Sequence, residues 1–222
     1  MTTYVKVEGS LTGGRRVPRM NLGVGGASFA LVPQGITAAG ATVSWMDEVS
    51  GQVITGGPNC SVGASGGVHV SGGGAGGGIP VPSGLVSDNF TMLAVVKVGG
   101  GTAYLGDVGQ YKVATNSGSG GMFWIERTGI SRVICAGGQK AQQVLVMRCQ
   151  GTSSRIISGG STQYDHNITN ATRAAFTSQY IGCASTAGAE WSAFALWPSA
   201  LTNSQMDAIL AQNLTNFPTA SR

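Results

Sequence analysis

The most constraining feature of this chain is an apolar run at residues 189–197 that leads directly into a capped amphipathic helix. Apolar residues fill both alternations of Glu190–Trp197, which is typical of a strand covered on both faces. Pro198 ends the run, and Thr202 with Gln205 three residues later has capping-box spacing. The helical face behind this cap is apolar, at Met206, Ile209, Leu210 and Leu214. The pattern predicts a buried strand and then a short helix that packs on a sheet.

Short β-prone runs alternate with glycine-rich turns over the rest of the chain. The expected strands are Phe29–Val32, Thr42–Met46, Gln52–Thr55, Val68–Ser71, Phe90–Val98, Thr102–Gly106, Tyr111–Thr115, Met122–Glu126, Arg132–Cys135, Val144–Cys149, Arg155–Ser158, Gln179–Gly182 and Trp191–Trp197. Strands at this spacing, with one helix at the end, predict an all-β fold, either a sandwich or a barrel. A length of 222 residues suits one such domain.

The composition combines a sizeable core with an uncharged surface. Hydrophobic residues make up 42% of the chain and charged residues 10%, so Ser, Thr, Asn, Gln and Gly cover most of the exterior. Such surfaces are associated with parts of larger assemblies and with extracellular proteins. No apolar run is long enough to span a bilayer, and residues 1–8 contain no hydrophobic signal region. We therefore expect neither membrane insertion nor export by the usual secretory route.

Basic residues gather at one place only, at Arg15, Arg16 and Arg19 near the amino terminus. The net charge of +4 lacks the dense basic stripe, interleaved with aromatics, that nucleic-acid binding needs. We therefore expect no nucleic-acid partner. The arginine cluster is interpreted either as an attachment point for an acidic partner surface or as a solvated arm, and the sequence favours the solvated arm.

The four cysteines form no Cys-x-x-Cys pair, which argues against a zinc knuckle or a redox motif. Cys135 and Cys149 are spaced so that they could face each other across a hairpin. Buried free thiols are the simpler interpretation in a reducing cytosol.

One stretch, Gly63–Gly67, matches the Gly-x-Ser-x-Gly pattern of a hydrolase nucleophile elbow. His166 and an acid such as Asp107 are conceivable triad partners. An elbow requires a strand before the serine and a helix after it, whereas a strand-like run follows here. The motif is therefore expected to be a chance match in a chain rich in Gly and Ser.

Paired carboxylates for glycoside cleavage are the more serious catalytic possibility. Within one strand such a pair needs i, i+2 or i+4 spacing, and none of the nine acidic residues provides it. A cross-strand pair, such as Glu126 with Glu190, is the remaining route to an enzyme. We expect the chain not to be an enzyme.

Metal and cofactor chemistry has little support in the sequence. His69 and His166 lie far apart, there is no zinc-binding His-Glu-x-x-His motif, and none of the lysines follows a phosphate-loop glycine pattern. We expect no cofactor and no metal. Calcium at Asp88, Asn89 or Asp107 stays open.

The best candidate for ligand binding is Tyr164-Asp165-His166-Asn167, which places an aromatic ring beside hydrogen-bonding groups. A sugar ring needs a stacking face on one side and donors and acceptors at its edge. Trp124 is a second candidate face. The alternative is that Trp124 belongs to the core and that residues 164–167 form a polar turn, and the sequence favours this alternative.

Three blocks of sequence, in order, resemble the concanavalin A-like, laminin-G-like jelly-roll lectin superfamily. Val43–Gly51 resembles its opening block of a strand followed by Trp-x-Asp-x-x-Ser-Gly, Ser87–Val96 its central strand entered by Phe-Thr, and Trp191–Leu210 its closing strand, turn and helix. These blocks frame roughly residues 22–215, which implies one domain at residues 22–222 after an arm or attachment segment at residues 1–21. The resemblance implies a two-sheet antiparallel jelly-roll sandwich together with sugar or protein binding, but the paired-acid catalytic strand of the family's enzymes is missing.

Within that superfamily, domains of this size and composition look like bacteriophage virion proteins of the tail fibre, baseplate or capsid surface. The resemblance implies a non-enzymatic structural or adhesion protein, made in the host cytoplasm and located in the virion. Its implied partners are other virion proteins, a bacterial surface polysaccharide and, as a homo-oligomer, its own copies. The alternatives are a polysaccharide-cleaving glycoside hydrolase of the same fold and a purely architectural subunit without a ligand.

Overall fold

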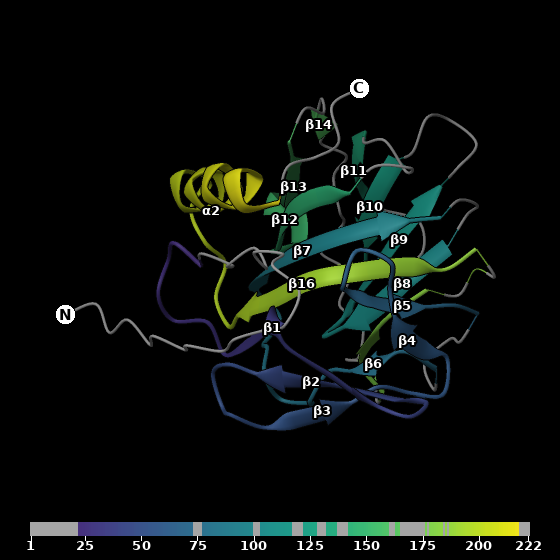
Figure 1. The fold of residues 1–222 in the computed structure, drawn as a ribbon. Coiled ribbons are helices and arrows are strands. Elements are labelled where there is room, and N and C mark those ends of the chain that lie inside the picture. Colours follow the sequence, from purple (N-terminus) through teal and green to yellow (C-terminus); the bar gives the residue numbers. More distant parts are fainter. Residues whose placement is uncertain are drawn as a thin grey trace.

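Two antiparallel sheets face each other in the computed structural model, which confirms the all-β sandwich (Figure 1). The structure describes residues 22–72, 77–99, 103–116, 122–127, 132–136, 142–159, 163–164, 176, 178–183, 185 and 187–217. In Figure 1 one sheet lies towards the viewer and is called the front sheet here; the other is called the back sheet.

The front sheet is built around the apolar strand near the end of the chain. Its order is β13 (Arg155–Ser158), β12 (Gln143–Cys149), β7 (Phe90–Val98), β16 (Ala189–Trp197), β1 (Phe29–Ala39), β2 (Thr42–Asp47) and β3 (Val53–Thr55). The amino-terminal part of β16 also pairs with β5 (Val68–Val70), which pairs with β4 (Cys60–Val62). Every residue of β16 is buried, because sheet neighbours flank it and both of its faces are covered.

The back sheet consists of β14 (Gln163–Tyr164), β11 (Arg132–Ala136), β10 (Met122–Glu126), β9 (Tyr111–Asn116), β8 (Ala103–Val108), β15 (Tyr180–Ile181) and β6 (Ile79–Pro80), in that order. Its central strands form a meander, since β8, β9, β10 and β11 are paired in chain order. Strand β15 arrives from far along the chain and pairs with both β8 and β6.

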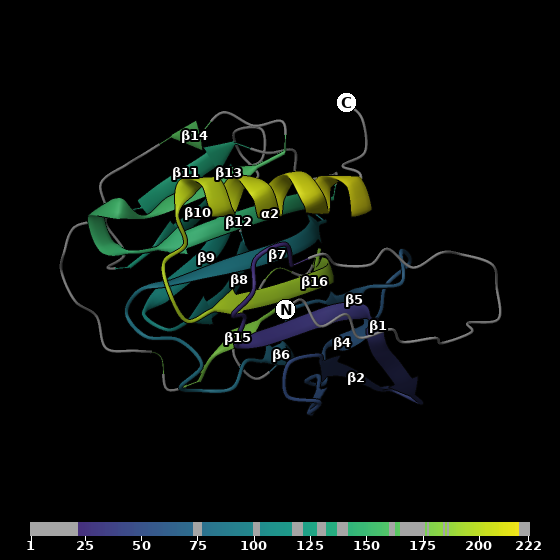
Figure 2. The ribbon, with the colours of Figure 1, turned by 90° about the vertical axis from the view of Figure 1, so that its left-hand side faces the viewer.

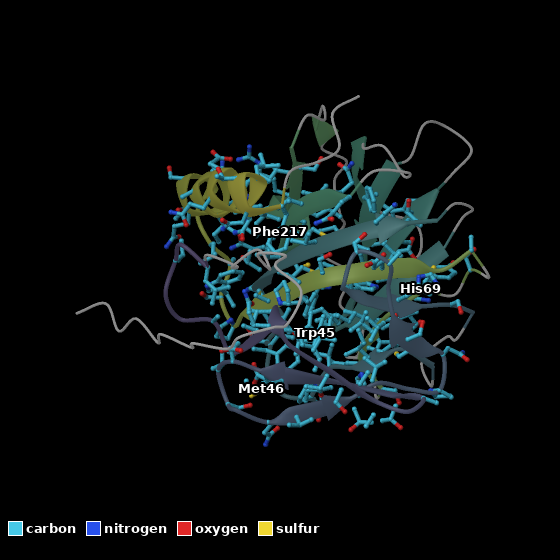
Figure 3. The ribbon with its side chains drawn as sticks, in the orientation of Figure 1. Trp45, Met46, His69 and Phe217 are labelled. Carbon is cyan, nitrogen blue, oxygen red and sulfur yellow. The ribbon has the colours of Figure 1, made fainter. Side chains whose placement is uncertain are left out.

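The space between the sheets is filled by large apolar side chains. Phe194 of β16 makes edge-to-face contacts with Phe29 and with Trp191, at ring-centroid separations of 6.2 and 6.1 Å. Trp45, labelled in Figure 3, is 1% exposed and its indole Nε1 donates to the Val32 carbonyl at 2.6 Å. The two sheets therefore share one continuous core.

Helix α2 (Asn203–Asn216) lies over the β12–β13 end of the outer face of the front sheet (Figure 2). The predicted capping box is confirmed, because Gln205 N donates to Thr202 Oγ1 at 3.3 Å and Thr202 N donates to Gln205 Oε1 at 2.9 Å. Met206 and Ile209 are fully buried against outward-facing residues of β7, β12 and β16, together with Phe217 beyond the helix. Phe217 is labelled in Figure 3. This packing explains why both alternations of β16 are apolar.

The strand boundaries follow the sequence closely, with some differences. Phe90–Val98, Met122–Glu126 and Arg155–Ser158 have the predicted bounds. Strand β1 is longer than predicted, since pairing with β2 resumes at Ile36 after a register shift beyond Leu31. The sequence did not predict the short strands β4, β6 and β14.

The cysteines do not form the hairpin pair that their spacing suggested. Cys135 lies in β11 of the back sheet, whereas Cys149 lies in β12 of the front sheet, opposite Phe90. Among the described side chains, Cys60, Cys149 and Cys183 are buried free thiols. Burial raises the pKa of each, and raises that of Cys149 well above its ordinary value.

No helix in the described ranges is long and apolar enough to cross a membrane. Residues 1–21, including Arg15, Arg16 and Arg19, lie outside the described residues. The expected attachment role of this segment stays a prediction.

Candidate functional site

The outer face of the back sheet carries a mixture of aromatic and charged side chains. Residues that lie directly opposite each other in paired strands share a face of the sheet. Phe123 and Ile125 of β10 point into the core, so Trp124 and Glu126 lie on the outer face. Two rows of residues can be followed from β10 across its neighbours.

The first row runs through Trp124. On one side Trp124 lies opposite Ala114 of β9, which lies opposite Tyr104 of β8. On the other side Trp124 is paired with the Ile134 position of β11, and that position with Tyr164 of β14. Two candidates from the sequence, Trp124 and Tyr164, therefore occupy one row, two strands apart. That separation is about 9.6 Å at the usual strand spacing.

The second row carries charges of alternating sign. Glu126 lies opposite Lys112 of β9, and Lys112 lies opposite Asp107 of β8. The register continues from Glu126 to the Arg132 position in β11 and from Asp107 to Tyr180 in β15. Burial raises the pKa of the Tyr180 phenol, and the negative charge of Asp107 raises it further.

Lys112 lies between two aromatic rings on this face. Its Nζ is 4.8 Å from the ring centroid of Tyr104 and 5.7 Å from that of Phe176. Both separations are within the range of cation–π attraction. We call Tyr104, Lys112 and Phe176 the Lys112 clamp.

Backbone contacts fix Phe176 in the clamp. Its N–H donates to the carbonyl of Gly109 at 2.9 Å, and Gly109 N donates to Gln179 Oε1 at 3.1 Å. Gly109 is in the β8–β9 turn, and Tyr180, one residue after Gln179, begins the pairing of β15 with β8. Phe176 is thus attached to the same two strands that carry Tyr104 and Lys112.

The two halves of this face differ in exposure. Tyr104 is 46% exposed, whereas Trp124 is 6% and Glu126 is 8% exposed. The ring of Trp124 is therefore covered in this structure although it lies outside the inter-sheet core. Asp165, His166 and Asn167 lie outside the described residues, as does the side chain of Tyr164, so sugar binding by these candidates stays a prediction.

The Gly63–Gly67 stretch is a hairpin turn between β4 and β5, and not a nucleophile elbow. Glu190 Oε1 accepts hydrogen bonds from Ser65 N at 2.8 Å and from Gly67 N at 3.1 Å. A Cβ at Gly67 would lie 2.5 Å from the backbone oxygen of Trp191, so the close approach of this turn to β16 requires glycine there. The motif binds a carboxylate of its own chain, and a strand rather than a helix follows it.

The cross-strand pair Glu126 with Glu190 does not exist. Glu190 lies on the outer face of the front sheet, opposite His69 and Lys97, because its neighbours Ala189 and Trp191 both point into the core. Glu126 lies on the outer face of the back sheet. The whole inter-sheet core separates the two carboxylates, so this pair cannot act on one bond.

Ser61, His69 and Glu190 lie opposite one another across β4, β5 and β16, an order that resembles a Ser-His-acid triad. The side chains do not form one. The carboxylate of Glu190 reaches the Gly63–Gly67 turn, while the His69 ring lies against Gly188, where a Cβ would be 2.6 Å from its Nε2. His69 is labelled in Figure 3.

Asp47 and Asp88 have structural roles in the described fold. Asp47 is 2% exposed and its Oδ1 accepts from Ala30 N at 2.8 Å, while its Oδ2 accepts from Ser50, so it ties β1 to the turn after β2. Asp88 accepts a hydrogen bond from Gln110, whose Oε1 in turn accepts from Arg127 Nη2 at 2.6 Å. Among the described residues, no group of three or more His, Cys, Asp or Glu side chains is arranged to hold a metal ion.

Sequence reasoning did not single out Tyr104, Lys112 or Phe176. Tyr104 and Lys112 fall within predicted strands, and their shared face depends on the irregular register of β8 with β9 between Tyr104 and Gly106. Phe176 comes from a connection much later in the chain. The one signal available in the sequence was the alternation within Tyr111–Thr115, which places Lys112 on the side away from the core.

Comparison with protein-family models and with curated protein sequences gives no match. Solved structures with a similar fold include Trypanosoma rangeli sialidase, at 15% identity and a TM-score of 0.60 over 84% of this chain and 33% of the sialidase. The same sialidase as a covalent intermediate with 2,3-difluorosialic acid also gives 15% identity and a TM-score of 0.60, over 94% of this chain and 36% of the sialidase. At such identities the likeness shows the fold alone.

The chain spans about a third of the length of the sialidase it matches. The observed sandwich is consistent with the concanavalin A-like fold that the three sequence blocks suggested.

Proposed function

We propose that this chain is a non-enzymatic structural and adhesion protein of a phage virion, and that it binds a bacterial surface glycan through the outer face of the back sheet. One observation carries the proposal, the Lys112 clamp with its half-exposed Tyr104. A glycan site needs an aromatic face for the apolar side of a sugar ring and polar groups at the edge of that face. Tyr104, Lys112 and Asp107 offer both on two adjacent strands.

The arrangement of the sandwich supports a site on this face. Helix α2 occupies the outer face of the front sheet, and its cluster is apolar and buried. The β8–β9 half of the back sheet instead presents an exposed ring and partly exposed charges. The likeness to a sialidase that was solved with sialic acid is compatible with a carbohydrate ligand.

The virion role is supported by the uncharged polar composition and by the resemblance of the three sequence blocks. The segment at residues 1–21, outside the matched blocks, is the proposed contact with neighbouring virion proteins. Immunogold imaging of intact particles from the source, with an antibody to residues 22–222, tests this location. Label on the particle surface supports it, and absence of the protein from purified particles contradicts it.

The carboxylates support a non-enzymatic role. Glu190 and Asp47 accept several backbone hydrogen bonds each, which positions them for structure and not for proton transfer. Glu126 is only 8% exposed, whereas Tyr104 on the same face of the sheet is 46% exposed. A general acid or base must reach the bond that is cleaved.

A glycan array of bacterial surface polysaccharides tests the binding function directly. Tyr104→Ala removes the exposed ring, and we expect it to weaken binding about tenfold, the value of one stacking contact. Val53→Ala is the matched control, since Val53 is 64% exposed on the edge strand β3 of the other sheet. A protein that binds no glycan under conditions sensitive to millimolar affinity is a purely architectural subunit, and the adhesion function is then wrong.

A glycoside hydrolase is the second candidate, and one specific observation favours it. Asp107 and Glu126 occupy the same row with Lys112 between them, so their strands lie about 9.6 Å apart. Separations of about 6.5–9.5 Å are typical of inverting glycosidases. The test is whether the protein releases reducing ends from surface polysaccharide. If it does, and if both Glu126→Gln and Asp107→Asn lose this activity, then the chain is a glycoside hydrolase and the non-enzymatic proposal is wrong.

A further inference from the structure

Among the described residues, no carboxylate or carbonyl group accepts a hydrogen bond from the ammonium group of Lys112. Within the described part of the chain, its contacts are the ring faces of Tyr104 and Phe176, and neither ring accepts a conventional hydrogen bond. No carboxylate of the described residues lies within 4.0 Å of its Nζ. Asp107 occupies the opposite position in β8, yet the ammonium lies over the rings and not in an ion pair with it.

The clamp also restricts a side chain that is ordinarily flexible. A free lysine side chain carries about 2 kcal/mol of rotamer entropy, which a ligand must overcome if it orders the chain on binding. Here the rings of Tyr104 and Phe176 hold the ammonium, and Gly109 holds Phe176 through its carbonyl. Much of the ordering cost is therefore met during folding.

The exposed ring beside the ammonium defines the chemistry of a ligand. Tyr104 is 46% exposed, and the Lys112 ammonium lies over its ring, so a pyranose ring can stack only on the part of the Tyr104 ring that stays exposed. A substituent at the edge of that sugar would then lie near an ammonium that has no carboxylate partner among the described residues, and a negatively charged substituent gains most from that position.

From this geometry we propose that the Lys112 clamp is a subsite for an acidic sugar, in which Tyr104 stacks on the ring and Lys112 binds its carboxylate or phosphate. The proposal rests on the glycan binding proposed above and specifies the charge of the ligand. It assigns Lys112 the selection of acidic over neutral glycans.

The test uses the full chain and an array of bacterial polysaccharides in native, carboxyl-reduced and dephosphorylated forms. Carboxyl reduction replaces each carboxylate with an alcohol, and dephosphorylation removes phosphate, so the two treatments identify the anion. Lys112→Met keeps the length and apolar stem of the side chain but removes the charge. Lys112→Arg keeps the charge. Lys97→Met, an exposed lysine of β7 on the front sheet, is the matched control.

We expect the native protein to prefer acidic polysaccharides and to lose about tenfold in affinity when the relevant anion is removed. Lys112→Met should lose a similar factor for the acidic ligand and show no further loss after removal of the anion. Lys112→Arg should stay within about threefold of the native protein, and Lys97→Met should be unchanged. Binding should weaken with added salt in the native protein and much less in Lys112→Met.

Binding of neutral polysaccharides alone would overturn the acidic-sugar subsite and leave glycan adhesion intact. The same conclusion follows if Lys112→Met binds acidic glycans as well as the native protein does. Absence of binding to every polysaccharide, in contrast, overturns the adhesion function itself and the subsite with it. A circular dichroism spectrum and melting temperature for each variant exclude loss of fold as the cause of any loss.

Discussion

The two outer faces of the sandwich differ in what covers them. On the front sheet, Met206 and Ile209 of α2 belong to one buried apolar cluster with outward-facing Val95 and Val146. On the back sheet, the outward positions of β8 and β9 hold Tyr104, Lys112 and Asp107, which keep part of their exposure. The cluster on the front sheet stabilises the fold, whereas the β8–β9 half of the back sheet is the proposed ligand site.

This difference shows how cover limits the side chains of a sheet. Where a strand is covered on both sides it must be apolar on both alternations, which constrains the part of β16 at Ala193–Trp197 and leaves little room for polar chemistry there. A sheet covered on one side has free choice at every second position.

Trp197→Ala is expected to produce the largest loss of stability, because it opens a cavity in the buried apolar cluster that contains residues of α2. Trp197 is 1% exposed in the cluster beneath α2, and its Nε1 donates to the Val24 carbonyl at 3.1 Å. We expect a loss of about 3–5 kcal/mol in the free energy of unfolding, measured by chemical denaturation. A loss below about 1 kcal/mol would show that α2 does not depend on this packing.

Glu190→Ala is expected to cost less, because it leaves backbone donors unsatisfied but opens no large cavity. The Ser65 and Gly67 amides both donate to Glu190 Oε1 on the outer face of the front sheet. We expect a loss of about 1–3 kcal/mol in unfolding free energy. Glu48→Ala, an exposed acid in the turn after β2, is the control and should be nearly neutral. If both variants behave alike, the bonds from the Gly63–Gly67 turn contribute nothing net.

Most of the fold could be predicted from the sequence, because burial determines which positions of a strand are apolar, and this apolar pattern is visible in the sequence. Strand β16 is apolar at both alternations because both of its faces are buried. The Thr202 capping box is a local sequence signal that needs no tertiary context. The short strands β4, β6 and β14 were missed, since they are two or three residues long and no longer β-prone run in the sequence includes them. Their pairing is set by the longer strands beside them.

The candidate site was less predictable, because it depends on strand register and on a distant connection. The sequence singled out Trp124 and Tyr164, and the register places both on one row of the back sheet. It did not reveal that Trp124 is covered or that Phe176 reaches Lys112. An irregular register such as that of β8 with β9 leaves no reliable mark in a sequence.

The shared core predicts a loss of stability in alkaline solution. Burial raises the pKa of Cys149 well above its ordinary value of 9.0, and raises that of Tyr111 above 10.0. The unfolded chain therefore releases these protons at a lower pH than the folded chain does. Stability should be complete below pH 9.0 and fall as the pH rises above the pKa of the unfolded thiol, by about 1.4 kcal/mol per pH unit for one such group.

Denaturation at pH 7.5 and pH 10 measures this loss. Cys149→Ala should reduce the difference between the two pH values, even though the small cavity lowers stability at both. An unchanged difference would mean that the Cys149 thiolate is tolerated in the core. Thiol labelling gives a second measure, since Cys149 should react only when the chain unfolds.

The smallest effects are expected on the open face, where stability and binding should separate. Lys112→Met and Tyr104→Ala remove cation–π contacts between partly exposed groups, which contribute about 0.5–1 kcal/mol each. We therefore expect both variants to lose no more than about 1 kcal/mol in unfolding free energy while losing ligand affinity. Chemical denaturation measures the first quantity and the glycan array the second. A loss as large as that of Trp197→Ala would mean that the clamp stabilises the back sheet as α2 stabilises the front one, and the division between the two faces would then be wrong.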